Sequence, residues 1–130
     1  MAKAVVSQYN QYKLFDTIPI NGELTLGENI ADLGGLTIAY EAFKTTLQYK
    51  SQIIIDGLTP DQRFFLAFAQ SNMVVTRPDL QRRLINIDSH SPIEFRINGA
   101  LSNFSPFYKA FKVSPDNKMF RTEQDRILIW

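Results

Sequence analysis

The stretch Gly27-Glu28-Asn29-Ile30-Ala31-Asp32 places two acidic residues, Glu28 and Asp32, four positions apart. On a helix, residues at that spacing share one face and point to one place. Such a pair suits a metal ligand together with a carboxylate that orients a second ligand. Glu28 also stands three residues after Thr25, so a capping box at the start of a helix is the alternative interpretation.

A metal site built on this pair needs more ligands than the chain offers. A catalytic zinc site takes three protein ligands, and histidine nitrogens commonly accompany a glutamate. The sequence of 130 residues has one histidine, His90, and no cysteine. The chain therefore cannot assemble such a site from its own residues.

Three segments share an order and spacing that resemble the neprilysin and endothelin-converting-enzyme family of zinc metallopeptidases. They are residues 21–36, which include the acidic pair, then Asp88-Ser89-His90-Ser91-Pro92 with Phe95-Arg96-Ile97-Asn98-Gly99, and finally Phe107, Ala110-Phe111 and Trp130. The Phe-rich run at 64–70 is also similar, so the resemblance extends from about Tyr9 onward. An H-E-x-x-H segment is absent from the sequence. We therefore expect residues 1–130 to be the C-terminal part of a longer catalytic domain.

The resemblance implies roles for the acidic pair. Glu28 would be the third zinc ligand, beside two imidazoles from an H-E-x-x-H helix elsewhere in the polypeptide. Asp32 would accept a hydrogen bond from one of those imidazoles and fix its tautomer. Zinc is thus the expected cofactor, but one carboxylate would hold it weakly, so the chain alone is expected to be inactive.

The second segment supplies the other residues that the resemblance implies. His90 would donate a hydrogen bond to the oxyanion that forms on the scissile carbonyl, and Arg96 would bind the substrate backbone. Asp88 would orient the His90 ring or favour its protonated form. Taken singly, these residues have plainer interpretations: a surface loop for His90, a turn or cap for Asp88, and a structural ion pair for Arg96.

Composition limits the partners. A net charge of +1 gives no reason to expect nucleic acid or an anionic membrane surface, and no apolar run approaches the ~20 residues of a membrane span. The resemblance implies peptide substrates and the rest of the same polypeptide as partners. We also expect self-association through apolar surface near Leu33 and the Phe-rich helix.

The family's animal members carry disulfides. Met73, Val113 and Ile127 stand where cysteines are expected. Aliphatic side chains fill similar space to buried thiols. This pattern points to a bacterial member, and the family then implies the periplasm or the cell envelope.

The predicted fold is mainly α-helical, and the resemblance implies the helical C-terminal portion of a zincin-type metallopeptidase catalytic domain. Helices are expected over about 2–12, 26–49, 60–76, 78–86 and 92–103, with another from Ser105. Asn21-Gly22 predicts at most a short hairpin or loop near the N-terminus. Gly34-Gly35 indicates either a close helix contact or a bend without functional meaning. Trp130 is expected to pack in the core.

Two functions fit these observations. The leading one is a part of a zinc endopeptidase that acts on small to medium peptides. The alternative is a helical binding or scaffolding module that works without metal.

Overall fold

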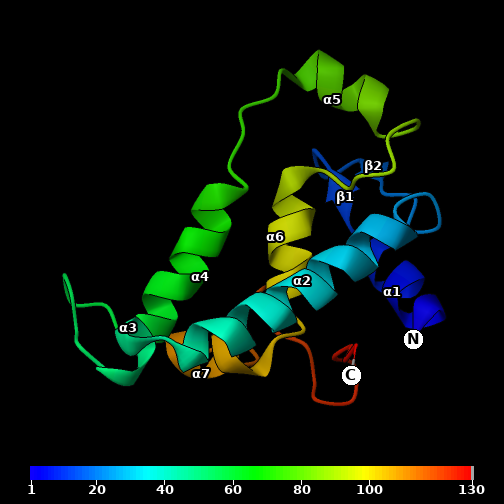
Figure 1. Cartoon of the computed structure of the whole chain (residues 1–130). Coiled ribbons are helices and arrows are strands. Elements are labelled where there is room, and N and C mark those ends of the chain that lie inside the picture. The colour runs from blue at the N-terminus through cyan, green and yellow to red at the C-terminus, as the bar shows by residue number, and fades with distance from the viewer. Residues whose placement is uncertain (130) are drawn as a thin grey trace.

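Helices dominate the computed structural model, which describes residues 1–129 (Figure 1). Within that range the elements are α1 (Ala2–Tyr9), β1 (Lys13–Leu14), β2 (Ile18–Pro19), α2 (Leu26–Thr45), α3 (Leu47–Lys50), α4 (Pro60–Ser71), α5 (Pro78–Leu84), α6 (Ile93–Leu101) and α7 (Ser105–Phe111). None of the helices in this range is long and apolar enough to cross a membrane. The mainly helical fold class is confirmed. Trp130 lies outside the described residues.

The long helix α2 is the central element against which other helices pack. Helices α1 and α6 pack against it, and α3, α4 and α7 lie toward its C-terminal end (Figure 1). Its buried side includes Leu33, Leu36 and Tyr40, which belong to the same apolar core as Phe95 and Ala100 of α6. The apolar face of α2 thus fixes α6 beside it, and the loop before α6 carries His90.

Aromatic rings fill the space between α2, α4 and α7. The Tyr40 ring stacks on Phe65 with centroids 5.5 Å apart, and Phe65 meets Phe107 edge to face at 5.6 Å. Stacked and edge-to-face pairs at such distances are favourable beyond their buried area. Phe65 is 1% exposed, so the Phe-rich helix contributes this ring to the core.

Helix α4 begins where the sequence predicted it, but it ends earlier than predicted. The Thr59 hydroxyl accepts from Gln62 N, and Gln62 Oε1 accepts from Thr59 N, which is the predicted capping box. The helix ends at Ser71 and not near residue 76. The run Val74-Val75-Thr76 is β-branched and precedes Arg77-Pro78, two features that disfavour helix.

This early end overturns one prediction about the core. Met73 lies beyond α4 and is 72% exposed, so it does not fill a buried position. Ile127, by contrast, is buried in the core as expected.

The predicted helix 26–49 is broken in two. Thr46 has extended backbone with ψ of 155°, so α2 ends at Thr45 and α3 begins at Leu47. The Thr46 hydroxyl donates to Phe43 O and accepts from Tyr49 N. Threonine side chains that bond nearby backbone groups compete with helix in this way.

The hairpin lies earlier than Asn21-Gly22, where the sequence placed it. Lys13 pairs with Pro19 and Leu14 with Ile18, and the turn uses positive φ at Phe15 and Asp16. Gly22 instead lies against α1, where a Cβ atom would be 2.5 Å from Val6 O. Close approach to a helix, not a strand turn, requires glycine there.

Candidate metal and substrate site

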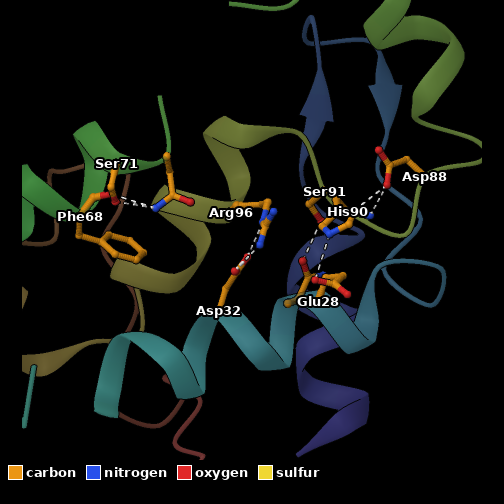
Figure 2. A network of polar contacts seen from close by, with 10 residues as sticks. Glu28, Asp32, Phe68, Ser71, Asp88, His90, Ser91 and Arg96 are labelled. Atoms are coloured by element: carbon orange, nitrogen blue, oxygen red, sulfur yellow. Dashed lines mark hydrogen bonds and ion pairs between the residues drawn. The ribbon is translucent and has the colours of Figure 1, made fainter. Parts of the chain in front are cut away.

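Glu28 and Asp32 lie on one side of α2 and project toward the loop before α6 and toward α6 itself (Figure 2). The capping box that would compete for Glu28 is replaced by other bonds. The Thr25 hydroxyl donates to Asn21 O and accepts from Asn29 Nδ2. The Glu28 carboxylate is therefore directed to His90, with Oε2 3.1 Å from His90 Nε2.

The His90 ring is held between two carboxylates. Its Nδ1 lies 2.8 Å from Asp88 Oδ1, and its Nε2 faces Glu28. Both contacts are hydrogen bonds only when the ring carries two protons. The same Asp88 oxygen accepts from His90 N at 2.9 Å. These bonds, the backbone one foremost, hold the pKa of Asp88 below its usual value.

Asp32 and Arg96 form a bidentate ion pair. Arg96 Nη2 donates to Asp32 Oδ1 at 2.6 Å, and Nε donates to Oδ2 at 2.8 Å. The hydrogen bonds to Asp32 raise the pKa of Arg96, and burial opposes that shift. The sequence did not predict that Asp32 and Arg96 would pair with each other. Asp32 retains lone pairs beyond the two that Arg96 uses, because an ionised carboxylate can accept about four hydrogen bonds.

A cleft of about 1400 Å³ opens beside these residues. Its walls come from the β1 turn, the segment 73–76, α5 and the start of α6, and Asp88, His90 and Arg96 are among the residues that line it. Asp88, His90 and Arg96 thus place polar side chains on the wall of this cleft.

No group of three or more His, Cys, Asp or Glu that could hold a metal ion occurs in the part of the chain that the structure describes. Glu28 offers a carboxylate oxygen, a donor that zinc accepts. The side chain is 38% exposed, so its carboxylate is accessible from outside this chain.

Sequence reasoning gave no role to Asn29 and Ser91, although both stand next to predicted site residues. Ser91 Oγ donates to Asn29 Oδ1 at 2.8 Å, and both side chains are buried. A polar residue that follows Glu28 must turn about 100° around the helix and so away from the metal face. This helical geometry could have indicated from the sequence that Asn29 points away from the metal face.

The sequence and the fold match known peptidases. A family model described as peptidase family M13 matches residues 1–127. The chain belongs to peptidase family M13. Endothelin-converting enzyme 1 of Rattus norvegicus is 41% identical over 127 residues, and Neprilysin-3 of Drosophila melanogaster is 37% identical over 127 residues. These alignments cover 93% and 95% of the chain, which spans 16% of each relative.

Solved structures confirm the M13 fold. The zinc metalloprotease ZMP1 of Mycobacterium tuberculosis, in its open state, superposes with a TM-score of 0.87 at 38% identity and covers 99% of this chain. PEPO from Lactobacillus rhamnosis gives a TM-score of 0.82 at 30% identity, again over 99% of the chain. The chain corresponds to 21% and 19% of those two structures.

Proposed function

We propose that this M13 chain forms part of a zinc-dependent endopeptidase and supplies one metal ligand and two substrate-binding side chains. The proposal rests above all on one observation. Glu28 contacts His90, and four positions further along α2 Asp32 contacts Arg96, so residues up to 64 positions apart pair up, and His90 and Arg96 also line a cleft. Membership of a peptidase family supports the same function.

Glu28 is the residue that would hold zinc. Its accessible carboxylate suits a metal with nitrogen and oxygen ligands, and the single histidine of the chain faces it without completing a three-ligand set. We therefore infer that two further ligands come from another part of a longer polypeptide. Zinc, when bound, activates water and polarises a peptide carbonyl. The isolated chain is expected to bind it weakly.

His90 would stabilise the charge that develops on the scissile carbonyl oxygen. Asp88 engages Nδ1, which leaves Nε2 as the nitrogen that faces Glu28. When both ring nitrogens carry a proton, Nε2 is a donor beside a metal ligand and can bond the oxyanion. One such donor is typically worth ~2.7–4 kcal/mol of barrier.

Arg96 would bind a carbonyl or carboxylate of the substrate. Two of its nitrogens donate to Asp32, and the side chain also lines the cleft. The ion pair keeps the guanidinium in one orientation, so less freedom is lost when a peptide binds. Asp32 would in addition accept a bond from an imidazole ligand of the metal.

The test separates metal binding from turnover in the polypeptide that carries this chain with its remaining metal ligands. Glu28→Ala is expected to remove zinc and activity together, whereas His90→Ala is expected to keep zinc and lower kcat by about 100- to 1000-fold. Zinc content and turnover of a short peptide are measured for each variant.

The control is Glu41→Ala, which removes another α2 glutamate from an ion pair, here with Lys44 at 2.8 Å. It should keep both zinc and activity. Full zinc content in the Glu28 variant would contradict the ligand assignment. Loss of zinc in the His90 variant would contradict the separation of roles. A wild-type protein that neither binds zinc nor cleaves peptides would favour the scaffolding alternative.

A further inference from the structure

A buried hydrogen bond joins the residues that directly follow Glu28 and His90. Ser91 Oγ donates to Asn29 Oδ1 at 2.8 Å across 62 positions of the chain. Asn29 is 0% exposed and Ser91 is 3% exposed. Figure 2 shows Ser91 beside His90, on the loop that faces the first turns of α2. The bond therefore links the loop to the helix immediately behind the Glu28–His90 contact.

The bond belongs to a series of hydrogen bonds that runs from Ser91 to Asn21. Asn29 Nδ2 donates to Thr25 Oγ1 at 2.9 Å, and Thr25 Oγ1 donates to Asn21 O at 3.1 Å. Because the Asn29 amide nitrogen is used at the Thr25 end, its oxygen must face Ser91. Hydrogen bonds in such a series polarise one another, and each member is left unsatisfied if a neighbour is removed.

The contacts of the His90 ring, by contrast, are open to solvent. The His90 side chain is 46% exposed, and its partners Glu28 and Asp88 are 38% and 35% exposed. Ion pairs at such exposure contribute little to holding a structure together. A buried polar pair resists separation more strongly, because breaking it leaves a buried acceptor without a hydrogen bond. The position of His90 thus depends on the pair behind it.

We propose that Asn29 and Ser91 are positioning residues that hold His90 Nε2 against the Glu28 carboxylate. The geometric part of this proposal concerns the chain alone. The consequence for turnover rests on the proposed peptidase function. A misplacement of about 1 Å in a catalytic group can lower turnover on the order of 100-fold, so the effect should be measurable.

The first test uses NMR on the 130-residue chain, because its single histidine gives one unambiguous set of imidazole signals. Ser91→Ala is expected to shift or broaden the His90 ring signals. Ser102→Ala is the matched control, since Ser102 is also 3% exposed and its hydroxyl also makes buried bonds, to Gly99 O and from Gln8 Nε2. Wild-type ring signals in the Ser91 variant, or equal shifts in both variants, would overturn the proposal.

A measurement on the wild-type chain covers the case in which Ser91→Ala does not fold. The backbone order parameters of His90 and Ser91 should match those of α2, near ~0.85. Values below ~0.6 would mean that the loop is not held, and would overturn the proposal without any variant.

The catalytic consequence is tested in the complete peptidase. Ser91→Ala and Asn29→Ala should each lower kcat by about 10- to 100-fold with KM and zinc content nearly unchanged. The double variant should be no slower than Asn29→Ala, because both changes break the same bond. Unchanged kcat alongside displaced ring signals would overturn the catalytic consequence. Failure of the peptidase function itself would appear separately, as wild-type protein without zinc or turnover.

Discussion

Asp32 and Arg96 are each other's main partners, and this pairing determines what a substitution there should do. Their side chains are 15% and 21% exposed, and two bonds of 2.6 and 2.8 Å join them. Removing one member of a buried pair leaves the other charge uncompensated, which costs about 3–5 kcal/mol in full burial. Some water reaches this pair, so we expect Asp32→Ala to lower the free energy of unfolding by roughly 2 kcal/mol.

Urea unfolding of the chain measures this loss. Glu41→Ala serves as the control because its ion pair with Lys44 is exposed, and it should lower stability by less than ~1 kcal/mol. Equal losses in the two variants would mean that the Asp32–Arg96 pair contributes no more to the free energy of unfolding than an exposed ion pair does.

The identities of the site residues could be read from the sequence, but their contacts could not. Glu28, Asp32, Asp88, His90 and Arg96 stand in segments that resemble the family. Spacing along a helix also placed the two α2 carboxylates on one face. The bond from Arg96 to Asp32 spans 64 positions, and nothing local specifies it. The bond between Ser91 and Asn29 spans 62 positions and was overlooked for the same reason.

The elements show the same division between local and distant causes. The Thr59 capping box was predictable because all its groups lie within four residues. The hairpin was misplaced because Asn21-Gly22 has the composition of a turn, whereas its glycine serves contact with α1. The break at Thr46 went unseen because the apolar spacing continues through it.

The packing of α6 on α1 gives a sharp test of one such contact. A Cβ atom at Gly99 would be 2.6 Å from the Tyr9 hydroxyl and 2.9 Å from its ring. We expect Gly99→Ala to lower the free energy of unfolding by about 1–3 kcal/mol through overpacking. Thermal unfolding monitored by circular dichroism measures the change.

Gly35→Ala is the matched control, because Gly35 is also helical and a Cβ atom there meets nothing within 4 Å. Without a clash, alanine should stabilise α2 by about 1 kcal/mol. Stabilisation by both substitutions would contradict the close contact between Tyr9 and Gly99.

The whole molecule should lose stability in alkaline solution. Burial raises the pKa of Tyr9 and of Tyr40 above the ordinary value of 10.0, and for Tyr40 the hydrogen bond to Asp61 adds to the shift. The folded state therefore keeps these protons while the unfolded chain releases them. The stabilisation is fully present below about pH 10 and is lost as pH rises further.

Urea unfolding between about pH 9 and about pH 11 measures this loss, and Tyr9→Phe should reduce its slope. The Tyr9 hydroxyl has no hydrogen-bond partner among residues 1–129, so the variant should be little affected at neutral pH. A pH dependence identical in wild type and variant would contradict the burial of this group as the cause.

Self-association stays a prediction, and the apolar surface available for it lies mainly away from Leu33 and Phe65. Leu33 is 4% exposed and Phe65 is 1% exposed, so the core of the chain covers both. Exposed apolar side chains instead cluster in two loops, at Ile53 and Ile54 and at Val74 and Val75. Sedimentation velocity is expected to show association that rises with concentration and weakens in Val74→Lys with Val75→Lys. A monomer at every concentration would contradict it.

The most direct test of the central claim locates the metal itself. Crystals of the complete zinc-loaded polypeptide, measured at the zinc absorption edge, are expected to show an anomalous peak about 2.0–2.2 Å from a Glu28 carboxylate oxygen. Two imidazoles from outside residues 1–130 should complete the set, with His90 and Arg96 beside the metal. A zinc peak that Glu28 does not touch would contradict the account.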